Sequence, residues 1–512
     1  MTAMAEFLSA QAAHYGDEEM LRVDGEGRTY GALMRDTRSL AAGLAALGVG
    51  SGTRVGILMD TSHRTIDVWF ALSLLGCVDA PFNCNYRGSL LLHLVEDSEV
   101  QFIVCDALHL DEVQRVVRDA SREITVIVNG ADAPGGAVSL GSLYRDAEAL
   151  DLDGITGGEV ILYTSGTTGP SKGVVHNQRG AILLAQYVAE VCGYGPGDRL
   201  LNFFPLYHQN ARYTGVLAAI AAGAAVDLER KFSSSGFWTL CRDRGITAFN
   251  YLGSVLTMIL SGAQPDAAKD RDHSVRVGWG AGASQKDREE LRERFGVELV
   301  EVYGLTEAPM ATVNLIGSGC AVGSAGRASK FFEVRVVADD GGPADVGEPG
   351  DIQLRPRLDD VFTRGYYGND RATVAATQDL WFNTGDRGYL SADGDLFFAE
   401  RAKDSLRRRG ENISAWEVES VLVADPRVVE AAVYGVVIDG DEEVMAALLL
   451  EEPDLDPRAI VRDIAGNLPK YAVPRFVRVV DDMPRTPTMK VQKNELKKDG
   501  VTPDTVDLTL EK

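Results

Sequence analysis

The sequence has little of what a secreted, membrane-spanning or zinc-cluster protein needs. Its six cysteines form no CxxC pair, and their spacing favours neither a zinc site nor a disulfide framework. The longest apolar stretch, residues 213–226, is shorter than the ~20 residues that span a bilayer. Residues 1–11 contain neither a basic segment nor an apolar signal core. We therefore expect no membrane span, and the cysteine usage favours the reducing cytoplasm.

Positive charge is also scarce. Lys and Arg number 51 against 75 Asp and Glu, which gives a formal net charge of -24. No basic excess exists to neutralise the phosphates of a nucleic acid, so nucleic acid is not an expected partner. The ordinary consequence of such acidity is solubility.

Strand and helix patterns alternate over the first third of the chain. The expected strands are residues 55–59, 102–105 and 124–128, and the expected helices are residues 65–78 and 110–117. This alternation is typical of parallel sheets covered by helices, so the predicted fold class is α/β.

The end of the chain has a pattern of its own. Helices are expected at 415–423 and 457–468, with a strand at 428–437 between them. We therefore predict a large N-terminal domain, residues 1–402, with parallel-rich sheets covered by helices. A small α+β domain, residues 403–512, would follow it, and its size is within the usual range for a domain.

A loop rich in glycine and hydroxyl side chains is the most informative feature. Residues 163–173, YTSGTTGPSKG, follow the apolar run 160–162, which is typical of a strand. Glycines let backbone N–H groups approach a phosphate, and Lys172 adds a positive charge. The spacing is not that of a Walker A loop, and a plain connecting loop is the alternative. The predicted phosphate contacts are Thr164, Ser165, Gly166, Thr167, Thr168 and Gly169, and Lys172 is a candidate catalytic residue.

Four further segments accompany this loop. In chain order they are YGLTE at 303–307, WFNTGD at 381–386, RAKD at 401–404 with RGEN at 409–412, and PRTPTMKVQK at 484–493. Together with the loop, they resemble the AMP-forming adenylating superfamily of acyl-CoA synthetases, firefly luciferase and peptide-synthetase adenylation domains. The resemblance covers nearly the whole chain and looks closest to bacterial carnitine/crotonobetaine-type acyl-CoA ligases. It implies a mobile C-terminal domain that rotates about a hinge at Lys403 between two chemical steps.

The resemblance implies that ATP and Mg²⁺ bind to the large domain. The expected nucleotide contacts are Gly282, Ala283, Ser284, Tyr303, Gly304, Thr306, Asp386 and Arg401. Tyr303 would lie flat on the adenine, and Asp386 would accept hydrogen bonds from the ribose hydroxyls. Glu307 offers one hard oxygen ligand, which suits a Mg²⁺ site completed by water and phosphate. The family pattern has glycine before the arginine, whereas this chain has Glu400.

The resemblance also assigns the reacting groups. Lys490 would bridge the attacking carboxylate and the α-phosphate as charge builds there. The usual residue before this lysine is glycine, whereas Met489 stands here, so Lys493 is a second candidate. His208 would line the carboxylate site near the thiol channel. In the basic loop 407–412, Arg409 and Gly410 would bind coenzyme A.

Three hypotheses about function stay open. The first is an AMP-forming acid–thiol ligase, with an acid pocket from residues 210–213, 251–254, 279–281 and 308–313. Its small and aromatic residues and Arg212 favour a small or medium acid over a long fatty chain. The second keeps the adenylation but changes the acid or acceptor, as in an amide-forming ligase or a nitrite-activating diazotase. The third is an inactive nucleotide-binding protein. The sequence does not indicate whether the protein is a monomer or an oligomer.

Overall fold

The computed structural model describes most of the chain. The described residues are 1–130, 133–147, 150–164, 171–262, 269–283, 285–338, 340–401, 406–408, 411–413, 415–438, 441–452, 454–484, 491 and 493–509. They fall into two compact units. The first is Met1–Cys84, Glu96–Leu162 and Gly173–Glu400, and the second is Asn85–Val95, Tyr163–Lys172 and Arg401–Lys512.

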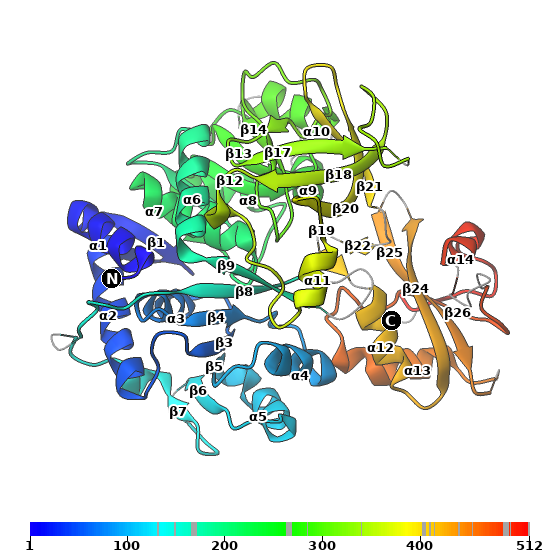
Figure 1. Cartoon of the computed structure of the whole chain (residues 1–512), viewed down its shortest axis with the longest axis horizontal. Helices are drawn as coiled ribbons and strands as arrows, with labels where there is room; N and C mark the ends of the chain where they lie inside the picture. The colour runs from blue at the N-terminus through cyan, green and yellow to red at the C-terminus, as the bar shows by residue number, and fades with distance from the viewer. Residues whose placement is uncertain are drawn as a thin grey trace. The chain divides into compact units, whose positions relative to one another are not determined.

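A seven-stranded sheet forms one part of the first unit (Figure 1). Its order is β7 (Val138–Ser139), β6 (Thr125–Asn129), β5 (Phe102–Asp106), β3 (Arg54–Leu58), β4 (Val78–Pro81), β8 (Glu159–Thr164) and β9 (Lys172–Asn177). Strand β3 pairs in parallel with both β4 and β5. The strand–helix alternation in the sequence therefore predicted this parallel sheet correctly, because each helix returns the chain to the same edge.

A nine-stranded sheet forms the other large layer. Its order is β16 (Arg327–Ala328), β15 (Thr312–Asn314), β14 (Glu298–Tyr303), β13 (Val277–Ala281), β12 (Ala248–Leu252), β10 (Arg199–Asn202), β11 (Ala225–Leu228), β1 (Glu19–Val23) and β2 (Glu26–Thr29). The strands from β1 to β14 in this order are parallel, and the antiparallel strands lie at its two edges.

Helices fill and cover the layers of the first unit. They are α1 (Ala3–Tyr15), α2 (Tyr30–Ala46), α3 (His63–Leu74), α5 (Leu110–Asp119), α6 (Gln178–Cys192), α7 (Ala218–Ala222), α8 (Phe237–Arg244), α9 (Gly253–Gly262), α10 (Gln285–Glu290) and α11 (Asp370–Ala375). Short helical segments are η1 (Ala107–His109), η2 (Leu140–Leu143), η3 (Asn210–Leu217), η4 (Leu291–Phe295) and η5 (Asp359–Val361). Helix α4 (Gly88–Asp97) belongs mostly to the second unit.

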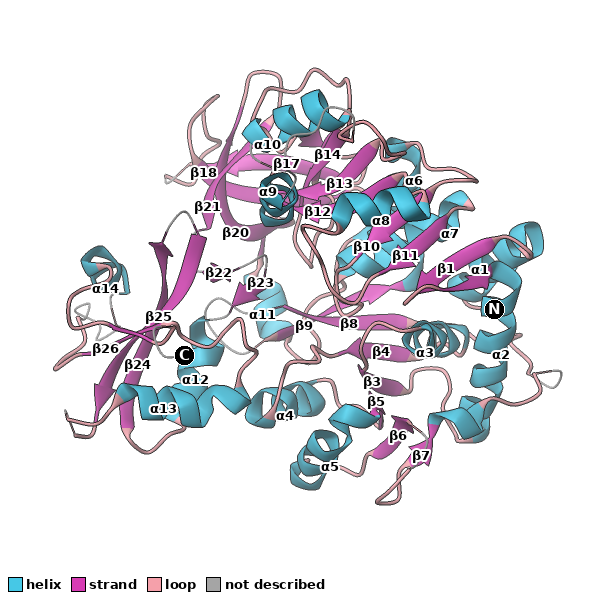
Figure 2. Cartoon of the chain, turned by 180° about the vertical axis from the view of Figure 1, so that it is seen from behind, coloured by secondary structure: helices cyan, strands magenta, loops and turns pink. Residues whose placement is uncertain are grey.

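Two hydrophobic cores hold these layers together. The larger joins both sheets through helices, with Leu40 of α2, Phe70 of α3 and Leu184 of α6 fully buried. The second lies on the other face of the nine-stranded sheet, where α8 and α9 cover β10 to β13 (Figure 2). Such burial stabilises by ~1.5–3 kcal/mol for each large apolar side chain.

An antiparallel sheet completes the first unit. It consists of β17 (Phe332–Val337), β18 (Gly350–Pro356), β20 (Trp381–Leu390) and β19 (Thr377–Gln378), with β21 (Leu396–Arg401) on β20. The Gly- and Pro-rich segment 340–349 connects β17 to β18.

The second unit has a sheet of its own. It runs in the order β24 (Val428–Ile438), β25 (Asp441–Leu450), β26 (Phe476–Val479) and β27 (Val506–Asp507), and β22 (Leu406–Arg408) pairs with β23 (Glu411–Ile413). Its helices are α12 (Ala415–Val423), α13 (Pro457–Ile464), α14 (Lys493–Asp499) and the short η6 (Ala465–Asn467). Tyr434, Met445 and Phe476 form its core.

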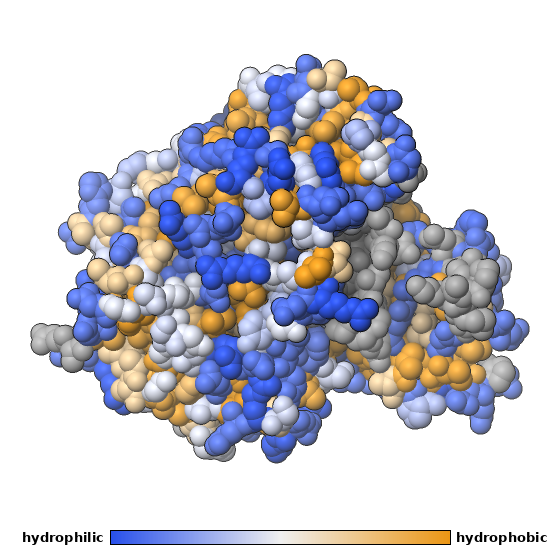
Figure 3. Space-filling model, viewed as in Figure 1, coloured by the Kyte–Doolittle hydropathy of each residue, from blue (hydrophilic) through white to orange (hydrophobic). Residues whose placement is uncertain are grey.

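The surface and the cysteines agree with the composition. Hydrophilic side chains cover much of the visible face, and apolar side chains occur there in scattered groups (Figure 3). All six cysteines are free thiols, and five of them are buried. None of the helices in the described part of the chain combines the length and apolarity that crossing a bilayer requires.

Candidate functional site

Glu307 is fixed in position at the end of the YGLTE segment. Strand β14 carries this segment at its carboxyl end, where ligands bind in α/β sheets. The side chain is buried, and its Oε1 accepts a hydrogen bond from the Tyr366 hydroxyl at 2.7 Å. Burial beside this carboxylate raises the pKa of Tyr366 well above its ordinary value. Tyr366 therefore stays a hydrogen-bond donor, and a held carboxylate of this kind suits a Mg²⁺ ion.

Two residues predicted from separate motifs meet in the structure. The Tyr303 hydroxyl donates to Oδ2 of Asp386 at 2.9 Å, and both side chains are buried. The tyrosine comes from β14 and the aspartate from β20, so two different sheets supply the pair. The hydroxyl orients the carboxylate, and the hydrogen bond places the Tyr303 ring directly beside it.

A β-bulge presents Asp386. Asp351 pairs with Arg387 whereas Gln353 pairs with Asn383, so β20 has extra residues opposite β18 at this point. Gly385 within the bulge has a φ of 73°, which favours glycine. Asp386 is therefore presented by a bulge within a continuous strand.

Glu301 is a residue of this site that sequence reasoning missed. Its buried carboxylate accepts hydrogen bonds from the backbone N–H groups of Gly282 and Ala283, the latter at 3.1 Å, and from the Tyr251 hydroxyl at 2.8 Å. Burial raises the pKa of Glu301, and Tyr251 and Arg288 oppose that rise. Glu301 therefore ties the Gly282–Ala283 segment to β14, which leads to Tyr303. The available signal was a charged residue between apolar residues in the middle of a strand.

His176 is a second residue that sequence reasoning missed. Its Nε2 lies 2.6 Å from the carbonyl oxygen of Thr306, which also accepts from the Gln209 side-chain amide at 2.8 Å. Burial lowers the pKa of His176 to about 4, so the ring is neutral near pH 7 and its Nε2–H donates. The ring thereby fixes the residue directly before Glu307. The available signal was a histidine directly after two valines near the end of the strand that starts at Lys172.

A polar network begins directly after His208. His208 itself is exposed and lies against Tyr207, with ring centroids 4.6 Å apart. Asn210 opens the π-helical segment η3, and its Oδ1 accepts from the Asn202 amide at 3.2 Å and the Asn250 amide at 2.9 Å. Such π-helical turns occur frequently at functional sites.

Arg212 has a different environment from the one expected. The sequence predicts that it lines the acid pocket; in the structure only 1% of it is exposed, and it forms an ion pair with Asp79. Its guanidinium carbon also lies 4.3 Å from the ring centroid of Trp69. Burial raises the pKa of Asp79, and Arg212 opposes that rise. Arg212 borders a cavity together with Phe82 and Tyr207.

Some of the other predicted site residues lie in the described part of the chain and some lie outside it. Thr164 ends β8 and Lys172 begins β9, so both flank the glycine-rich loop and are half-buried. The Gly304 position has no room for a Cβ atom, which would lie 2.6 Å from the backbone nitrogen of Met310. Arg401 ends β21, and its side chain is outside the described part. Ser165, Gly166, Thr167, Thr168, Gly169, Ser284, Lys403, Arg409, Gly410 and Lys490 lie outside the described residues.

Comparisons with known proteins agree with this geometry. The model of the AMP-binding enzyme family matches residues 8–367, and that of the AMP-binding enzyme C-terminal domain matches residues 417–490. The sulfoacetate–CoA ligase of Cupriavidus necator is 30% identical over 501 residues, which cover 96% of this chain and 97% of that protein.

Two further relatives extend the comparison. The crotonobetaine/carnitine–CoA ligase of Salmonella typhimurium is 27% identical over 95% of this chain and 97% of its own length. The structure of o-succinylbenzoate CoA synthetase from Bacillus subtilis has a TM-score of 0.82 and 25% identity, covering 96% of this chain and 98% of that one.

Proposed function

The chain belongs to the AMP-binding enzyme family and is an acid–thiol ligase of the AMP-forming class, and on this premise we propose its reaction. It activates a small or medium carboxylic acid as an acyl-adenylate and transfers the acyl group to coenzyme A. The observation that carries the proposal is the buried hydrogen bond from Tyr303, the first residue of the YGLTE segment, to Asp386. This hydrogen bond brings together the Tyr303 ring, which stacks on the adenine, and the Asp386 carboxylate, which accepts hydrogen bonds from the ribose hydroxyls. The free thiols support a cytoplasmic location.

The first half-reaction uses residues of the N-terminal domain, 1–402, together with Lys490 of the C-terminal domain. Asp386 accepts the ribose hydroxyls, and the backbone at Gly282 and Ala283 faces the adenine opposite Tyr303. Glu307 supplies a ligand to Mg²⁺, which shields the phosphate charge when it is bound. Lys490 lowers the barrier by facing the charge that develops between the carboxylate and the α-phosphate. Lys172 and the hydroxyl groups of its loop hold the departing phosphates.

The second half-reaction uses residues of the C-terminal domain. We place the domain boundary at 402/403, with Lys403 as the pivot. Rotation about it removes Lys490 and brings Arg409 and Gly410 to coenzyme A. Arginine suits phosphate recognition because its guanidinium is planar and always charged.

A polar acid is the substrate that the helix after His208 supports best. Asn210, Asn250 and Thr214 form a hydrogen-bonded set, with the Asn250 amide 2.6 Å from the Thr214 hydroxyl. The buried Oδ1 of Asn250 has no hydrogen-bond partner among the described residues. An aliphatic chain packed there would leave it unsatisfied at a cost of ~1–3 kcal/mol, whereas a polar acid can donate a hydrogen bond to it. A long fatty acid is therefore a poorer fit than a small polar acid.

A pyrophosphate-release screen tests the proposal. The full chain is supplied with ATP, Mg²⁺ and a panel of small acids and nitrite, each with and without coenzyme A or amines. We expect AMP, pyrophosphate and an acyl-CoA for at least one polar acid. Production of ADP and phosphate would contradict the proposed chemistry. Turnover with an amine or with nitrite, and none with coenzyme A, would replace the acceptor or the acid in the proposal.

A further inference from the structure

Three potential metal ligands converge at the carboxyl edge of the seven-stranded sheet. Asp60 follows β3, Cys84 follows β4 and His109 ends η1 directly after β5. Because β3 pairs in parallel with both β4 and β5, the ends of these neighbouring strands lie at one edge. All three residues belong to the first compact unit. None belongs to the nucleotide contacts described above.

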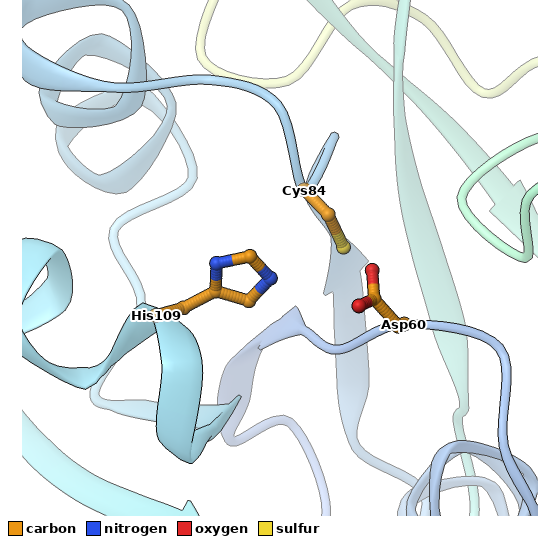
Figure 4. A group of neighbouring side chains, drawn as sticks. All are labelled: Asp60, Cys84 and His109. Carbon is orange, nitrogen blue, oxygen red and sulfur yellow. The ribbon is translucent and has the colours of Figure 1, made fainter.

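The three side chains point toward one another (Figure 4). One carboxylate oxygen, the thiol sulfur and one imidazole nitrogen all lie within 4.8 Å of each other. Ligand bonds of ~2.0–2.3 Å place the ligands of a tetrahedral Zn²⁺ about 3.5 Å apart. The group therefore needs to close by about an ångström, which side-chain rotation can supply.

The side chains of Asp106 and Thr65 hold the backbone of Asp60 in place. Oδ2 of Asp106, in β5, accepts from the Asp60 N–H at 2.8 Å, and its Oδ1 accepts from the Asn129 amide at 2.7 Å. The Thr65 hydroxyl donates to the carbonyl oxygen of Asp60. These contacts fix the backbone from which the Asp60 carboxylate extends.

The donor set determines which ion fits. His109 and Cys84 are buried and Asp60 is half-buried. One thiolate and one carboxylate carry two negative charges, so a divalent cation makes the buried group neutral, which removes the cost of burying unpaired charge. Sulfur and imidazole ligands favour Zn²⁺ over Mg²⁺ or Ca²⁺, which take oxygen ligands.

We propose that Asp60, Cys84 and His109 bind one Zn²⁺ ion that joins the loops following β3, β4 and β5. The Cys84 thiol, which is 3.9 Å from the carbonyl oxygen of Phe82, loses its proton to solvent when its sulfur bonds to the metal. Three protein ligands leave a fourth position for water on the half-buried side of Asp60.

Metal binding to the full, tag-free chain tests the site directly. The protein is stripped with a chelator and titrated with Zn²⁺ against a chromophoric competitor, in excess Mg²⁺ so that oxygen-only sites are occupied. We expect one Zn²⁺ per chain, a rise in melting temperature and release of a proton. Co²⁺ in place of Zn²⁺ should give a thiolate-to-metal charge-transfer band. Zinc binding no tighter than to unrelated surface histidines would overturn the proposal.

Matched variants assign the ligands. Cys84→Ser should remove the cobalt band and weaken zinc binding by more than the ~10–100-fold typical of losing a group that only orients a ligand. His109→Ala and Asp60→Asn should weaken it similarly. Cys320→Ser and His14→Ala change a thiol and an imidazole elsewhere and should leave zinc binding unchanged. A Cys84→Ser variant that keeps both the band and the affinity would overturn the assignment, and the wild-type titration decides even if a variant does not fold.

Discussion

Removing one hydroxyl group tests how the nucleotide site is held. Tyr303→Phe keeps the ring that would lie on the adenine but removes the donor 2.9 Å from Asp386. Hydrogen bonds to a charged partner contribute ~1.5–3 kcal/mol, and both side chains are buried here. If half of the upper value serves to orient the carboxylate for ribose, ATP binding weakens by about 1.5 kcal/mol, or about tenfold.

The assay is pyrophosphate release at varied ATP with a turned-over acid. We expect KM for ATP to rise about tenfold and kcat to change little, because the hydroxyl acts on binding rather than on the reacting atoms. A double-mutant cycle with Asp386→Asn should give a coupling energy of ~1–3 kcal/mol, since the two side chains share one hydrogen bond.

A matched tyrosine separates this effect from general damage. Tyr366→Phe removes the donor to Glu307, so it should raise the Mg²⁺ concentration needed for half-maximal rate and leave KM for ATP at saturating Mg²⁺ nearly unchanged. Additive effects of Tyr303→Phe and Asp386→Asn, or equal responses of the two tyrosine variants in both assays, would refute the reasoning.

The remaining predictions concern pH, loop support and the two half-reactions. The pKa of His176 falls from 6.5 to about 4 on folding, so the stability that it contributes is complete above pH 6.5 and is lost as pH falls toward 4. Measured with denaturant, the free energy of unfolding of the wild type should fall by about 3 kcal/mol more between pH 6.5 and pH 4 than that of His176→Gln. Glu301→Gln should lower the free energy of unfolding by ~1–3 kcal/mol, measured the same way, because its backbone partners lose an anionic acceptor. Lys490→Ala should slow adenylation by ~10²–10³ in rapid-quench experiments and leave transfer from a pre-made adenylate nearly intact; a larger loss from Lys493→Ala would reverse the two assignments. Lys403→Pro should spare adenylation and slow transfer, since proline fixes φ near -65°, and equal losses in both steps would exclude it as the pivot.

Local patterns gave the secondary structure and the family. The strands β3, β5 and β6 and the helices α5 and α12 lie where apolar periodicity predicted them, because that periodicity is set by which face each element buries. The motifs are also local, since each is a short run on one loop or strand. The sequence alone therefore determined the α/β class, the adenylating family and candidates such as Tyr303, Glu307 and Asp386.

Tertiary structure alone decided which side chains support those candidates. Glu301 reaches a loop 19 residues away, and His176 reaches a carbonyl 130 residues away. No spacing rule links such partners, because strand order and register, not chain distance, set which residues meet. Arg212 shows the same effect, since burial against Asp79 depends on how η3 packs on the seven-stranded sheet. Cysteine spacing likewise argued against zinc, whereas the parallel pairing of β3 with β4 and β5 brings Asp60, Cys84 and His109 together.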